Sequence, residues 1–214
     1  MTRSHGERRS ARRRQVAAAL VACVCVSWPA SAGGPSGPRF ASEVVRLEVA
    51  GAEQTVEGSY VFVNDAGPTR AAILYPFPAD SLLGVPRLLR ATISHGSSPP
   101  ETLTINTMRG SGWRWDLTMA ARETCRVTVR YAQPLVVSHA AYVLTSTRSW
   151  GQPLGHARLE VVLPANAERP RFSLPFRRAV GGDGRGVWTY EKKHFLPAKD
   201  LVVEWTTSAV PRRP

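Results

Sequence analysis

The sequence predicts an all-β protein, an antiparallel β-sandwich that follows an N-terminal secretory leader. Three observations lead to this fold class. Apolar and polar residues alternate with a period of two in many short runs, as in strands with one buried face. Clusters of Gly, Pro, Asn and Asp separate the runs and favour turns. After the leader, no stretch shows the sustained 3.6-residue apolar stripe of an amphipathic helix. Short strands without helical crossovers are typical of an antiparallel sandwich.

Residues 1–32 have the three parts of a signal peptide. Arginines crowd ahead of an uncharged apolar run from Val16 to Trp28, and Ala30-Ser31-Ala32 offers small residues for cleavage. The run is shorter than the ~20 residues that a membrane-spanning helix needs. We therefore expect an exported protein (periplasmic, cell-envelope or secreted) with no transmembrane segment in the mature chain.

Lipidation is the alternative to cleavage after Ala32. Leu20-Val21-Ala22-Cys23 has the form of a bacterial lipobox, in which Cys23 is acylated and becomes the mature N-terminus. An apolar core that begins after Gln15 is short for that reading, and Cys23 is also explained as a small apolar residue of the leader. Both interpretations stay open at this point.

The charge of the chain indicates what kind of partner it favours. The formal net charge is +12, and removal of six arginines and one glutamate with the leader leaves 22 basic and 15 acidic residues, a net charge of +7. A basic surface favours anionic partners such as phospholipid headgroups, lipopolysaccharide or acidic polymer. No nucleic-acid-binding motif is present, so we expect no nucleic-acid partner. The expected partner is a protein or envelope component of unknown identity, with an anionic surface as an option.

The rest of the chain divides into a tether, one domain and a tail. Residues 33–41 are rich in Gly and Pro and predict a flexible tether. Residues 42–208 predict a single β-sandwich domain, and 209–214 a basic tail. In chain order, the alternating runs predict these inward-facing residues: Val45, Leu47, Val49; Val56, Gly58, Tyr60, Phe62; Leu103, Ile105; Trp113, Trp115, Leu117, Met119; Cys125, Val127, Val129, Tyr131; Leu159, Val161, Leu163; Leu201, Val203, Trp205.

Cys125 is the only cysteine after the leader. A disulfide framework is therefore not expected, and packing must stabilise the domain. Cys125 is in phase with Val127 and Val129, while Arg126 and Thr128 take the other face. This alternation predicts a small buried hydrophobe rather than a nucleophile.

One hairpin carries a family resemblance. Val56-Glu57-Gly58-Ser59-Tyr60-Val61-Phe62-Val63-Asn64, followed by Leu74-Tyr75-Pro76-Phe77-Pro78, resembles the opening of vault/inter-alpha-trypsin (VIT-type) β-domains and of uncharacterised exported bacterial β-sandwich proteins. The similarity spans Thr55 to Arg90. It implies a β-sandwich and brings no catalytic residues, and the chain is too short to add the von Willebrand A domain that usually adjoins a VIT-type domain.

Sequence motifs predict no catalytic residue, no cofactor and no metal site. The histidines after the leader form no zinc-ligand spacing; they are His95, His139, His156 and His194. Glu191 and His194 are three apart, which on a strand places them on opposite faces. Asp183-Gly184 fits a hairpin turn better than a calcium or phosphate loop.

Aromatic residues suggest the alternative functions. Trp113, Trp115 and Trp205 share phase with core residues, whereas Trp150 lies beside Gly151 in a predicted loop and is the candidate ligand contact. The favoured function is a non-catalytic exported module for interaction or structure at the bacterial cell envelope. A carbohydrate-binding module and an unrecognised secreted hydrolase are the alternatives. An interaction module should expose an apolar patch or an unpaired sheet edge.

Overall fold

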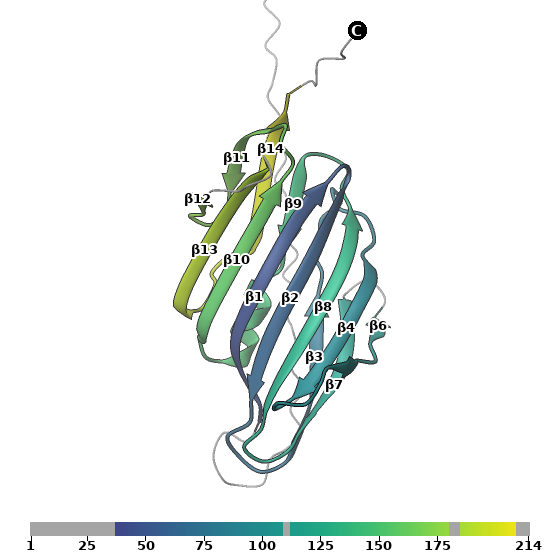
Figure 1. Cartoon of the computed structure of the whole chain (residues 1–214), viewed down its shortest axis with the longest axis vertical. Helices are drawn as coiled ribbons and strands as arrows, with labels where there is room; N and C mark the ends of the chain where they lie inside the picture. Colours follow the sequence, from purple (N-terminus) through teal and green to yellow (C-terminus); the bar gives the residue numbers. More distant parts are fainter. Residues whose placement is uncertain (1–36, 109–111, 180–184, 209–214) are drawn as a thin grey trace, which may run out of the picture.

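The computed structural model describes residues 37–108, 112–179 and 185–208. These residues form an all-β fold of two layers, as the alternation predicts (Figure 1). The predicted leader, the possible lipidation site Cys23, the tail and Asp183-Gly184 lie outside the described residues and stay predictions. No helix of the described residues is long and apolar enough to cross a membrane.

One layer is an eight-stranded sheet. Its strands, in spatial order, are β12 (Arg177–Ala179), β13 (Gly186–Phe195), β10 (Leu154–Leu163), β1 (Arg39–Ala50), β2 (Glu53–Val63), β8 (Thr124–Pro134), β4 (Arg87–His95) and β5 (Glu101–Thr102). All neighbours are antiparallel except β1 and β10, which pair in parallel. This pair joins the two halves of the chain and is the one departure from the predicted antiparallel sheet.

The other layer consists of two three-stranded sheets that lie behind the large sheet in the view of Figure 1. One contains β11 (Ala167–Phe172), β14 (Leu201–Thr207) and β9 (His139–Tyr142), and the other contains β3 (Thr69–Pro76), β7 (Gly112–Met119) and β6 (Asn106–Met108). A short 3₁₀ helix, η1 (Thr145–Trp150), follows β9.

The inward faces of the layers form one hydrophobic core, and most of the predicted core residues belong to it. Cys125 is fully buried, as its phase predicts. Leu103 is only partly buried, because β5 ends at Thr102 and Leu103 lines an open groove at the sheet edge.

The first strand overlaps the predicted tether. Strand β1 begins at Arg39, so residues 39–41 of the predicted tether belong to the sheet. The sequence hides this because a β-bulge between Phe40 and Ser42 breaks the alternation, and Phe40 turns inward to be buried.

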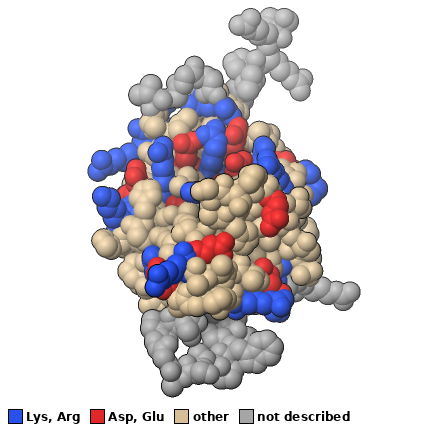
Figure 2. Space-filling view, turned by 60° about the horizontal axis from the view of Figure 1, so that its bottom comes forward, with Lys and Arg blue, Asp and Glu red and all other residues tan. Residues whose placement is uncertain are grey.

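Charged side chains are mixed on the surface. Figure 2 shows Lys and Arg near Asp and Glu around a broad uncharged area on the face in view. Several arginines lie within 4 Å of a carboxylate, including Arg70 with Asp116 at 2.7 Å. An anionic partner surface therefore stays a prediction.

Candidate ligand pocket

A cavity of about 50 Å³ lies between the two layers and is bordered by η1. Strands β1 and β2 form one wall, β3 and β7 the opposite wall, and the segment from β9 to η1 closes the side. Asp200 holds the start of η1, because its Oδ1 accepts hydrogen bonds from the backbone N–H groups of Leu144 and Thr145 at 2.9 and 2.8 Å.

Within the part of the chain that the structure describes, Glu43 is the one acidic residue that lines the cavity. It shares the inward phase of Val45 and Leu47 on β1, and its side chain is therefore directed into the core, where the residue is 2% exposed. Its Oε1 finds no hydrogen-bond partner among the described residues. Burial away from water disfavours the charged form and raises the pKa of this carboxyl to about 8.

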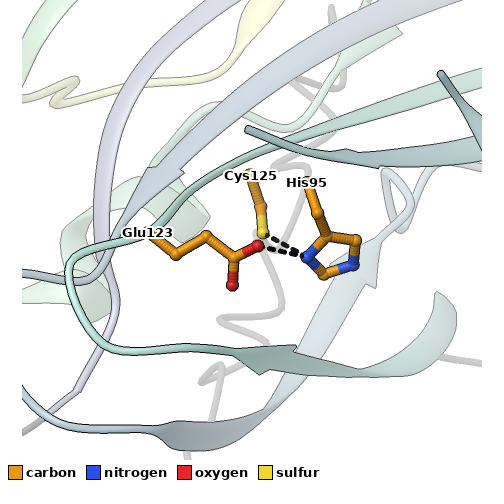
Figure 3. A group of neighbouring side chains, drawn as sticks. All are labelled: His95, Glu123 and Cys125. Atoms are coloured by element: carbon orange, nitrogen blue, oxygen red, sulfur yellow. Dashed lines mark hydrogen bonds and ion pairs between the residues drawn. The ribbon is translucent and has the colours of Figure 1, made fainter. Parts of the chain in front are cut away.

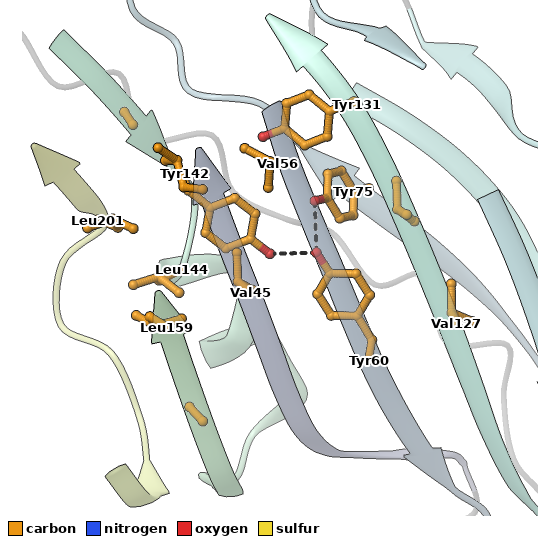
Figure 4. Packing of buried hydrophobic residues seen from close by; sticks show 14 of the residues in the cluster. Val45, Val56, Tyr60, Tyr75, Val127, Tyr131, Tyr142, Leu144, Leu159 and Leu201 are labelled. Atoms are coloured by element: carbon orange, nitrogen blue, oxygen red, sulfur yellow. Dashed lines mark hydrogen bonds between the residues drawn. The ribbon is translucent and has the colours of Figure 1, made fainter. Parts of the chain in front are cut away.

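Three tyrosine hydroxyls meet in the same region. The Tyr60 hydroxyl lies 2.8 Å from that of Tyr75 and 2.9 Å from that of Tyr142, so hydroxyls from β2, β3 and β9 form a connected group (Figure 4). Tyr60 is the cross-strand partner of Glu43 in the β1–β2 ladder, which places both side chains on one face. Burial raises the pKa of all three phenols, and the charge of Glu43 adds to the rise.

Gly58 makes room for this arrangement. It precedes Tyr60 by two residues on the same face of β2, and the Tyr60 ring folds back over it. A Cβ at position 58 would overlap the end of the Tyr60 ring, so only glycine leaves the hydroxyl in place.

A second residue of the cavity wall also has a buried polar atom without a hydrogen-bond partner among the described residues. The Trp115 indole Nε1 is buried and has no hydrogen-bond acceptor among the described residues, and Trp115 lines the cavity with Glu43. Buried polar groups are nearly always hydrogen-bonded, so an orphaned donor and an orphaned acceptor on one cavity point to a guest molecule or water.

Aromatic rings make up much of the wall. Seven of the fifteen described lining residues are aromatic; they are Phe40, Tyr60, Phe62, Tyr75, Trp115, Tyr142 and Trp150. Trp150, predicted from the sequence as a ligand contact, is half-buried and packs on Phe40 and Phe62 with ring centroids 5.8 and 5.4 Å apart. The structure therefore places Trp150 on the pocket.

The histidines considered from the sequence do not line this pocket. His156 lies 2.8 Å from Glu191 on the neighbouring strand, which gives Glu191 a partner other than His194. Sequence reasoning missed Glu43 and the tyrosine group. One feature of the sequence could have identified Glu43: it lies two residues before Val45 and therefore on the same inward face of the strand.

Comparisons with known proteins place the fold. No family model and no curated protein matches the sequence, so the VIT-type resemblance stays a prediction. A solved structure of a Legionella pneumophila protein, proposed to bind a nutrient, is similar over 78% of this chain and 66% of its own, with 15% identity and a TM-score of 0.58. An M1 zinc metallopeptidase of Deinococcus radiodurans is similar over 78% of this chain and 42% of its own, with 14% identity and a TM-score of 0.52. The chain spans less than two thirds of either protein, and similarity at this identity shows the fold alone.

Proposed function

We propose that this chain is an exported, non-catalytic β-sandwich module of the bacterial cell envelope that binds a small organic cation. The ligand's ammonium group would occupy the pocket beside Glu43. One observation supports the proposal most strongly: the Glu43 carboxyl is buried in an aromatic cavity, and its Oε1 has no hydrogen-bond partner among the residues that the structure describes.

The charge of the pocket favours a cation. Among the described residues that line the cavity, Glu43 is the only acid, and none is Lys, Arg or His. An ionised carboxylate removed from water is costly unless an opposite charge accompanies it. The faces of Trp, Tyr and Phe attract ammonium groups, most strongly where water is excluded. An ammonium group therefore satisfies both the carboxylate and the walls.

The size of the pocket favours a single headgroup. A cavity of about 50 Å³ holds a few waters or one small group. A sugar platform needs an open aromatic face, whereas Trp150 packs on Phe40 and Phe62. The carbohydrate-binding alternative therefore has less support from the structure than cation binding.

The pocket also gives little support to the hydrolase alternative. Glycosidases use two carboxylates, and the described residues of the cavity wall include no carboxylate besides that of Glu43. The His-Glu-x-x-His motif of zinc peptidases is missing from the sequence. Binding without chemistry is the simplest use of this arrangement.

Two further observations support a binding module. The structure exposes several large apolar side chains on the adjacent segments 85–89 and 136–137, as expected of an interaction module; they are Val85, Leu88, Leu89, Val136 and Val137. The Legionella protein of similar fold is proposed to bind a nutrient, which is an analogy of fold only. The envelope location rests on the predicted leader.

Calorimetric titration with choline tests the proposal, with 3,3-dimethylbutan-1-ol as its uncharged isostere. At pH 9, where Glu43 is mostly ionised, we expect choline to bind the wild type and the alcohol to bind much more weakly. Glu43→Gln keeps the shape of the side chain and should weaken choline binding at least about tenfold. Glu57→Gln, on the outer face of β2, is the matched control and should bind like the wild type.

Two results would overturn the proposal. One is equal binding of choline to the wild type and to Glu43→Gln. The other is no binding of choline, methylammonium or tetramethylammonium by a folded wild-type protein.

A further inference from the structure

A second group of chemically active side chains lies where β4 ends and β8 begins. It shares no residue with the cavity around Glu43, which we call the ammonium pocket. His95 is the last residue of β4, Cys125 is its cross-strand partner on β8, and Glu123 directly precedes β8. Figure 3 shows the three side chains pointing toward one another. His95 and Glu123 also line an open groove of about 630 Å³ between β4–β5 and β6–β7.

The contacts converge on a single atom. His95 Nδ1 lies 2.8 Å from Glu123 Oε1 and 3.0 Å from Cys125 Sγ, and the three atoms all lie within 4.8 Å of one another. A ring nitrogen either bears a proton or offers a lone pair. It cannot donate to the carboxylate and accept from the thiol at the same time. Without a metal, the thiol must therefore donate to Glu123 or share the Nδ1 proton, whereas a cation between the three atoms would use a lone pair from each.

The same geometry does not suit a cysteine catalytic triad. In a triad the histidine contacts the nucleophile with one ring nitrogen and the orienting carboxylate with the other. Here both neighbours contact Nδ1. Cys125 is also fully buried, which does not suit a nucleophile that must meet a substrate.

Glu123 is held in place by its own turn. Its Oε2 accepts a hydrogen bond from the backbone N–H of Ala120 at 2.5 Å, which directs Oε1 toward His95. Buried Asn64 fixes the turn, because its Nδ2 donates to the carbonyl oxygen of Ala120 at 2.6 Å and its N–H donates to that of Glu123 at 2.8 Å. Such outer contacts orient ligands in metal sites.

We propose that His95, Glu123 and Cys125 form a binding site for a zinc-class divalent ion. A nitrogen, an oxygen and a sulfur ligand suit Zn²⁺ or Co²⁺, whereas Ca²⁺ and Mg²⁺ prefer oxygen alone. Zinc–ligand bonds of ~2.0–2.3 Å require ligand atoms about 3.5 Å apart, so the side chains need only a small outward movement from 2.8 and 3.0 Å. Binding displaces the thiol proton to solvent. Three protein ligands leave a fourth position for water.

The test uses the full chain with Cys23→Ser and Cys25→Ser, so that Cys125 is the only thiol. Titration with Co²⁺ should produce the near-ultraviolet thiolate-to-cobalt absorption at a ratio of one ion per chain, and Zn²⁺ should abolish it by competition. Cys125→Ser should remove the band, and His95→Gln or Glu123→Gln should weaken Zn²⁺ binding at least about tenfold.

Controls separate this site from general surface binding and from misfolding. His156→Gln removes the His156–Glu191 pair, whose contact is also 2.8 Å long, and should leave Zn²⁺ binding unchanged. Glu123→Gln keeps an oxygen that can accept the Ala120 N–H and is the variant expected to retain the fold. Circular dichroism checks the fold of every variant.

The inference is overturned if the folded parent chain binds no Zn²⁺, if Co²⁺ gives no thiolate band, or if His156→Gln weakens binding as much as Glu123→Gln does. The metal site and the ammonium pocket share no residue. Failure of Zn²⁺ binding therefore says nothing about choline binding at Glu43, and the two proposals can fail separately.

Discussion

Glu43 should make the stability of this protein fall as the pH rises through neutrality. The folded state raises the pKa of Glu43 from its ordinary value of 4.5 to about 8 because the carboxyl is buried. The folded chain therefore holds this proton more tightly than the unfolded chain does. The contribution to stability is fully present below about pH 4.5 and is lost as the pH rises to about 8.

The size of the effect follows from the shift. Each pKa unit corresponds to about 1.4 kcal/mol, so a rise from 4.5 to about 8 corresponds to a loss on the order of 5 kcal/mol across the window. That is a large fraction of the 5–15 kcal/mol by which domains are usually stable. Glu43→Gln carries no titrating proton, and the variant should lack this loss.

Urea unfolding from pH 5 to pH 9 measures the effect. Other groups titrate in both proteins, so the difference in unfolding free energy between the wild type and Glu43→Gln isolates position 43. Between pH 5 and pH 8, we expect the unfolding free energy of the wild type to fall by more than about 2 kcal/mol relative to that of Glu43→Gln. If the difference in unfolding free energy stays constant with pH, the assignment of Glu43 as a buried carboxyl with a raised pKa is refuted.

Four further predictions follow from the same structure. Tyr60→Phe should destabilise the fold by about 1–3 kcal/mol in urea unfolding, because it removes the hydroxyl that joins two buried phenols. An unchanged urea midpoint would show that these hydrogen bonds do not stabilise the fold. Gly58→Ala should lower the melting temperature and weaken choline binding, because the new Cβ displaces the Tyr60 ring. Unchanged choline binding would show that the position of the Tyr60 ring does not matter for the pocket. Without added metal, Cys125 should react slowly with thiol reagents when native and rapidly in urea, and Cys125→Ala should cost on the order of 1 kcal/mol; fast native labelling would show a slipped register. N-terminal sequencing of the exported protein should begin at or near Gly33, whereas an acylated Cys23 would favour the lipoprotein.

The strands were predictable because each has one buried and one exposed face. Alternation at Val56, Tyr60 and Phe62, and again at Val127 and Val129, directly reflects that environment. The inward phase of Cys125 was predictable for the same reason.

Pairings between distant strands were not predictable in this way. The parallel contact of β1 with β10 joins segments about a hundred residues apart, and alternation has no information on which strand is the neighbour. The bulge near Phe40 hid the start of β1, because one extra residue shifts the phase.

Both candidate sites depend on such pairings. Glu43 meets Tyr75 and Tyr142 only after three strands from different parts of the chain pack together. His95 meets Cys125 through the β4–β8 register, and no local spacing reveals it. Of these residues, Glu43 could have been recognised from the sequence, because the alternation places an acidic residue on the buried face of its strand.

The pH dependence of choline affinity tests the ammonium pocket most directly. Choline keeps its charge at every pH, so any change in affinity reports the state of the protein. If choline binds beside ionised Glu43, the affinity should rise about tenfold per pH unit up to about pH 8 and then level off. Glu43→Gln should show no such rise. An affinity that is flat or falls between pH 6 and pH 9 in the wild type would contradict cation binding at Glu43.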